Sequence, residues 1–65
     1  MKVELNGVSL SLFQGAKVKH ALLAYDEEVY RQVVEEKAVV VDPFGNEVEL
    51  SGALDPSFSY TVKDR

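Results

Sequence analysis

Few side chains in this sequence have the types and spacing that acid–base, nucleophilic or metal chemistry requires. The only histidine, His20, falls in a predicted helix, off its apolar face and without a base–nucleophile partner, so we interpret it as a solvated surface residue. The acidic runs 26–28 and 35–36 could bind a cation weakly, but acids also favour helix starts and solvated helix faces. The serines alternate with apolar residues on predicted strands as outward-facing polar positions: Ser9, Ser11, Ser57 and Ser59. We therefore expect no catalytic residue, no cofactor and no metal ion, and a protein that is not an enzyme.

The composition predicts one small domain and disfavours some classes of binding partner. We predict a single domain over residues 1–65, because 65 residues allow only one thin core. Because the sequence has no cysteine and one histidine, disulfide frameworks, thiolate metal sites and multi-histidine sites are excluded. The net charge of −4, from 11 acidic and 7 basic residues, disfavours nucleic acid as a partner. No stretch approaches ~18 consecutive apolar residues, so we expect no membrane partner and a cytoplasmic location.

The stretch from Ala16 to Lys37, which has no internal Gly or Pro, is predicted to form the helical layer. Its apolar residues recur at spacings of three and four, which places them on one helical face: Val18, Ala21, Leu22, Tyr25, Val29 and Val33. Asp26, followed by two glutamates, has the properties of a helix start. Leu23, Tyr30 and Val34 form a second apolar stripe that one straight helix would turn away from the core. We therefore predict two helical segments, or one bent helix, with a break at Asp26 that lets both stripes pack.

The residues before this helix predict a β-hairpin over residues 2–13. Apolar and polar residues alternate on both sides of Asn6-Gly7, a dipeptide that favours a type I′ turn because both central residues need a positive φ. A register that pairs Leu5 with Val8 puts the apolar side chains of both strands on one face.

The residues after the helix predict a second hairpin. Its strands are residues 38–42 and 47–50, joined by Asp42-Pro43-Phe44-Gly45-Asn46 as a type I turn followed by a left-handed glycine. In this register Val40 faces Val48, and both side chains point towards the helix.

A loop and a last strand complete the predicted fold. Residues 51–56 form a loop that turns Leu54 inward, and residues 57–63 form the strand. The order hairpin, helix, hairpin and strand predicts a two-layer α+β domain with a helix packed across one face of a mixed sheet. With a right-handed crossover, the last strand inserts between the two hairpins, parallel to the first strand. This arrangement is the ubiquitin-like β-grasp.

Three segments carry a resemblance to a known group of proteins: MKVELNG (residues 1–7), LFQGAKVKHALLAY (12–25) and LDPSFSYTV (54–62). They resemble, in order, the opening strand and turn, the strand, glycine and helix start, and the last turn and strand of the ThiS/MoaD sulfur carriers. The resemblance covers most of the chain. TGS domains and other β-grasp modules share the same layout, so it implies the fold more firmly than the subfamily.

The chain departs from these carriers at the residues that carry their chemistry. The carriers end in a flexible Gly-Gly whose carboxylate is adenylated and converted to a thiocarboxylate, whereas this sequence ends Val62-Lys63-Asp64-Arg65. Lys17 replaces the usual Ser or Thr at the helix start, and Pro56 replaces the Gly of the last turn. The resemblance therefore implies a β-grasp module used for binding. One alternative is a carrier relative that an adenylating or sulfur-transfer enzyme activates at a processed C-terminus, and another is a TGS-like regulatory module.

Three apolar residues are candidates for contact with a protein partner. Phe44, at a hairpin tip, either folds back onto the domain or contacts a partner. Val39 and Val41, on the sheet face away from the helix, are either covered by long neighbours or form a docking patch. Because ubiquitin-like proteins commonly dock through the open sheet face, the resemblance favours the patch. We predict a non-enzymatic interaction module that binds a protein through Val39, Val41 and Phe44.

Overall fold

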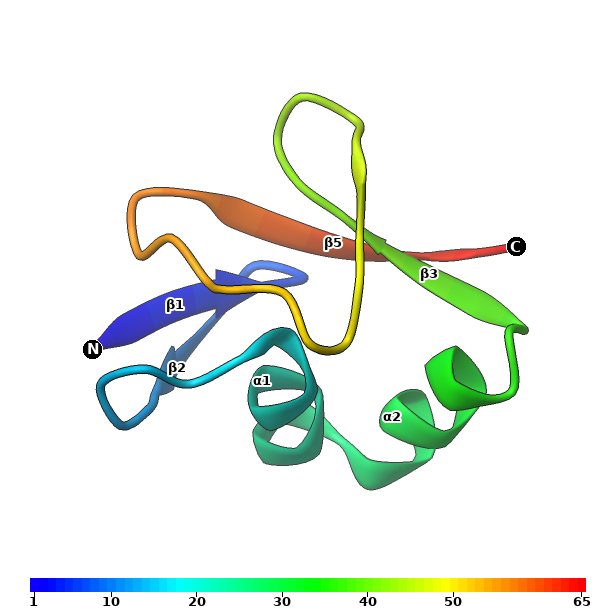
Figure 1. The fold of residues 1–65 in the computed structure, drawn as a ribbon, viewed down its shortest axis with the longest axis horizontal. Helices are drawn as coiled ribbons and strands as arrows, with labels where there is room; N and C mark the ends of the chain where they lie inside the picture. Colours follow the sequence, from blue (N-terminus) through cyan, green and yellow to red (C-terminus); the bar gives the residue numbers. More distant parts are fainter.

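A computed structural model describes residues 1–65 and contains two helices on one face of a five-stranded mixed sheet (Figure 1). In chain order the elements are β1 Lys2–Leu5, β2 Val8–Ser11, α1 Val18–Tyr25, α2 Glu27–Val34, β3 Ala38–Val41, β4 Glu47–Val48 and β5 Ser59–Asp64. The strand order is β2-β1-β5-β3-β4, with β1 and β5 parallel and the other neighbours antiparallel. The predicted two-layer α+β architecture is confirmed, including the insertion of the last strand between the two hairpins.

The first hairpin has the predicted turn and register. Asn6 and Gly7 have φ angles of 51° and 78°, as a type I′ turn requires, and Leu5 pairs with Val8. The strand β2 is an edge of the sheet, and Val8 at its start remains 45% exposed.

The last strand is tied to the first hairpin over a short length. The ladder between β1 and β5 has two residue pairs, which include Leu5 opposite Tyr60. Asn6 lengthens it, because its backbone N–H donates to the Tyr60 carbonyl and its Oδ1 accepts from the Val62 N–H, both at 2.9 Å. Asn6, which forms the turn of the first hairpin, therefore also positions β5.

The helical layer breaks at Asp26, as predicted. Asp26 is extended, with φ −168° and ψ 120°, and its Oδ1 accepts from the Glu28 N–H at 2.9 Å as the N-cap of α2. The two helices are shorter than the predicted stretch. At the end of α2, Glu36 adopts a left-handed conformation with φ 60°, which ends the helix without a glycine.

The strand β4 ends at Val48, although the sequence predicted that it reaches Leu50. The reason lies at the start of α1, where helical N–H groups need acceptors outside the helix. The carbonyls of Leu50 and Gly52 accept from the N–H groups of Lys19 and Val18, each at 3.0 Å. The chain leaves the sheet early because its backbone caps α1.

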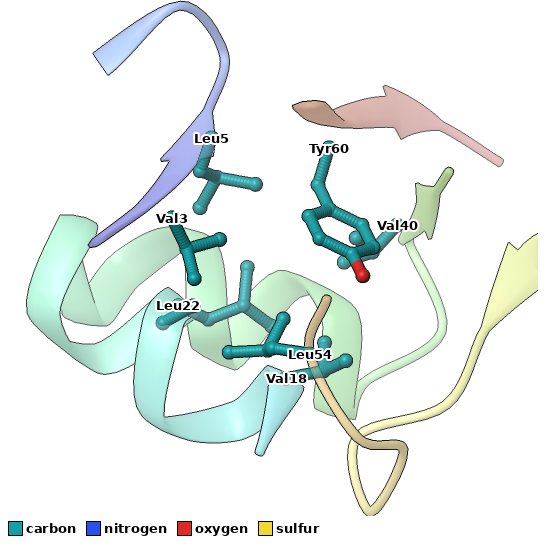
Figure 2. A pocket seen from close by; sticks show the side chains of 8 residues that line it. Val3, Leu5, Val18, Leu22, Val40, Leu54 and Tyr60 are labelled. Atoms are coloured by element: carbon teal, nitrogen blue, oxygen red, sulfur yellow. The ribbon is translucent and has the colours of Figure 1, made fainter. Parts of the chain in front are cut away.

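The core is a closed apolar layer between the helices and the sheet. Figure 2 shows its central side chains converging from the sheet, from α1 and from the loop after β4: Val3, Leu5, Val18, Leu22, Val40, Leu54 and Tyr60. The space between them has no room for a water molecule, and every buried residue is hydrophobic. Leu54 turns inward as predicted.

One part of the helix prediction is wrong. Tyr30 of the second apolar stripe packs against the core, but Leu23 and Val34 are 47% and 48% exposed. Leu23 precedes the break, so the break at Asp26 cannot change the side of α1 on which it lies. Val34 is the last residue of α2.

Replacement of Leu22 by Ala should lower the free energy of unfolding by about 2–5 kcal/mol, because this side chain is fully buried. The matched control is Leu23→Ala, the same change one residue later at a half-exposed position, which should cost less than about 1 kcal/mol. Urea denaturation followed by circular dichroism measures both. Equal losses would contradict the assignment of the helix face.

Candidate functional site

His20 has a structural role that the sequence did not reveal. Its Nδ1 accepts the backbone N–H of Lys17 at 2.8 Å, and its ring meets Phe13 edge-on with 4.7 Å between centroids. The side chain is partly buried. The interpretation as a solvated residue is therefore wrong, because the imidazole accepts the N–H of the N-cap residue Lys17, whose carbonyl in turn accepts the His20 N–H at 2.9 Å.

The acidic residues are engaged in local structure. Glu27 and Glu28 pair with Arg31 at 3.8 Å and 3.1 Å on the exposed face of α2. No group of three His, Cys, Asp or Glu side chains is placed to hold a metal ion. Of the four serines expected on strands, two donate to carboxylates, Ser57 to Asp55 and Ser59 to Glu4.

The carboxyl group of Asp55 organises the turn before β5. The Ser57 hydroxyl donates to its Oδ1 at 2.6 Å and the Ser57 backbone N–H at 2.9 Å. These hydrogen bonds favour the charged form and lower the pKa of Asp55 below its ordinary value. The Asp55 N–H in turn donates to the Tyr60 hydroxyl at 2.9 Å, which ties the turn to the core.

Val39 and Val41 lie on the sheet face away from the helices, as predicted, opposite Lys63 and Thr61 of β5. They differ in exposure. Val39 is partly exposed, whereas Val41 is only 9% exposed and offers little surface to a partner.

Phe44 is the most exposed large hydrophobic residue, at 74%. Its turn has the predicted geometry: the Asp42 carboxylate accepts from the N–H groups of Phe44 and Asn46, both at 2.9 Å. The Asp42 carbonyl accepts from the N–H of Gly45, whose φ is 83°. Three hydrogen bonds to Asp42 therefore fix the backbone of the turn that carries this exposed aromatic side chain.

The structure brings Phe44 together with other aromatic residues that the sequence analysis did not group with it. Its ring meets Phe58 edge-on with 5.5 Å between centroids, and Phe58 lies 6.2 Å from the buried Tyr60. We call these three residues the aromatic row. In the sequence, the alternation of polar and apolar residues places Phe58 and Tyr60 on one side of the last strand. It does not indicate that Phe44, at the tip of the second hairpin, contacts Phe58.

The acidic excess of the sequence falls in the segment that carries this row. Residues 38–62 contain four acids, Asp42, Glu47, Glu49 and Asp55, and no lysine, arginine or histidine. The rest of the chain contains seven acids and seven bases and is neutral. One of the four acids, Glu47, pairs with Arg65 across the edge of the sheet. The segment that carries Phe44 is therefore the acidic part of the molecule.

A shallow hollow of about 390 Å³ lies between the end of α2 and the β3–β4 edge. Its lining is half apolar, with Val33, Val39 and Val48 beside the Glu47–Arg65 pair. Its polar lining consists of the Ser51 hydroxyl, the Arg65 guanidinium and three glutamates, Glu36, Glu47 and Glu49.

Comparisons of this chain with models of protein families, with curated proteins and with solved structures found no match. Neither helix is long and apolar enough to cross a membrane.

Replacement of Ser57 by Ala should raise the pKa of Asp55 towards its ordinary value, because it removes the hydroxyl donor. The stability that the lowered pKa adds is present above about pH 4 and is lost as the pH falls through the folded-state pKa. NMR titration of the carboxyl carbon measures the change. Ser59→Ala is the control, since its hydroxyl donates to Glu4 and its loss should leave the Asp55 titration unchanged.

Proposed function

We propose that this chain is a ubiquitin-like β-grasp domain that binds a protein partner through a surface centred on Phe44, with the partly exposed Val39 on the open sheet face as a second candidate contact. The strand order β2-β1-β5-β3-β4, with parallel β1 and β5 and the helices on one face, supports the fold assignment. The proposed role is binding, because the accessible features are apolar contacts and not reactive groups.

The exposure of Phe44 on a fixed turn is the observation that carries the proposal. Aromatic side chains are enriched among the residues that dominate binding energy, and an anchor that is already ordered loses less entropy on binding. Asp42 holds the backbone of this turn, and Phe58 supports the ring from the side of the core. A flexible tip would have neither support.

The charge around Phe44 indicates the kind of surface that it fits. The partner should offer an apolar pocket for the ring with lysine or arginine side chains at its rim, opposite the acids of residues 38–62. Such rim charges mainly accelerate association and set orientation, so binding should weaken as the salt concentration rises.

Val39 is a second candidate contact, on β3 and on the sheet face away from the helices. Phe44 packs on the side of Phe58 and Tyr60, so the two residues are tested by separate variants. Val41 has little exposed surface, and we expect its replacement by Lys to destabilise the fold rather than to report on binding.

Phe44→Ala should abolish capture of the partner when the protein is purified from its native host, while thermal unfolding stays close to that of the original protein. Leu23→Ala is the matched control, since it removes a half-exposed apolar side chain elsewhere and should capture the partner normally. Once a captured protein is purified, titration calorimetry should show an affinity at least tenfold weaker for Phe44→Ala. Val39→Lys should weaken it as well.

Equal binding by the Phe44→Ala and original proteins would reject this surface. The intact mass of the captured chain tests the carrier alternative in the same experiment. A modified C-terminus, together with an adenylating or sulfur-transfer enzyme as the partner, would replace the proposal with a carrier function.

A further inference from the structure

We propose that two copies of this chain associate through the free edge of β2, joining their sheets around a two-fold axis. β2 is the first strand in the sheet order and has a neighbour, β1, on one side only. This edge is separate from the β3–β4 hairpin that carries Val39 and Phe44, which lies at the other side of the sheet. The inference therefore stands independently of the proposed function.

The pairing of β1 with β2 shows which backbone groups are free. Met1 and Leu12 exchange two hydrogen bonds, at 2.7 Å and 2.6 Å, so they form a hydrogen-bonded pair. Such pairs alternate along an antiparallel ladder, which makes Leu10 face β1 and makes Ser9 and Ser11 face away from it. Two N–H and two C=O groups of these serines point outward along the edge.

The two edges of the sheet differ in how they are protected. Edge strands in stable monomers usually carry charges or proline, or are very short, because unpaired strand edges recruit other chains. β4 has two residues, and its edge carries Glu49 and the Glu47–Arg65 pair. β2, Val8–Ser11, has four residues with no charge and no proline. It is the unprotected edge.

An antiparallel pairing centred on Leu10 uses every free group. Ser9 lies opposite Ser11 of the second copy and Ser11 opposite its Ser9, which gives four new hydrogen bonds. On the helix side Leu10 meets Leu10, and the half-exposed Val8 meets Leu12 of the second copy. Apolar side chains thus face apolar ones, and serines face serines.

No like charges face each other in this register. Lys2 lies beside Ser11 and Glu4 beside Ser9 on the outer face. Each row across the joined sheets therefore runs from Lys2 through two serines to Glu4 of the second copy, so that only uncharged side chains meet at the junction. Since each copy uses the same edge, the assembly closes at two copies and does not form a filament.

Sedimentation over a concentration series up to about 1 mM should show a monomer–dimer equilibrium for the original protein. The double variant Ser9→Lys with Ser11→Lys places like charges opposite each other and should weaken dimerisation at least tenfold. Glu27→Gln with Glu36→Gln is the matched control, since it raises the net charge equally at two exposed positions, one at the start of α2 and one just after its end, and should still dimerise. A mixture of the lysine variant with Ser9→Glu/Ser11→Glu should restore a dimer, because opposite charges then face each other.

Hydrogen exchange on the original protein gives a second test that needs no variant. The amides of Ser9 and Ser11 should become protected as the concentration rises, whereas those of Val8 and Leu10 should be protected at every concentration. A monomer at about 1 mM, open-ended oligomers, or a dimer that forms equally well with both lysines would overturn the inference.

Discussion

The parallel pairing of β1 with β5 is the constraint on which the rest of this structure depends. It joins the two ends of the chain, yet its ladder contains only two residue pairs, extended by the backbone and side chain of Asn6. Contacts between distant segments are costly in chain entropy, so a short ladder needs support from packing. Tyr60, buried at the end of this ladder, supplies that support inside the core.

The same strand links the core to the candidate surface. Tyr60 packs in the apolar layer, Phe58 packs against Tyr60, and the exposed ring of Phe44 rests against Phe58. The hydroxyl of Tyr60 also accepts the N–H of Asp55, which positions the turn before β5. The surface that we propose for binding is therefore the outer end of a packing chain that begins in the core. A partner would meet side chains that folding has already ordered.

Much of this fold was predictable because local signals agreed with one another. Asn6-Gly7 fixed the first hairpin, and Asp26 marked the break between the helices. The turn that begins at Asp42 set the second register, with Val40 opposite Val48. Three features were not predicted. Partners distant in the sequence decide two of them, and the third, the contact of His20 with Lys17 three residues away, uses a side chain that is uncommon as a helix cap. β4 stops early where its chain caps α1, His20 caps the same helix, and Phe44 contacts Phe58 rather than lying beside Val39.

The most direct test of the central claim is photo-crosslinking from position 44 in the native host, with a photoreactive phenylalanine analogue in place of Phe44. The account predicts a light-dependent covalent adduct with one protein, and no such adduct when the same group replaces Leu23. An adduct from position 23 but not from position 44, or none from either, would contradict it.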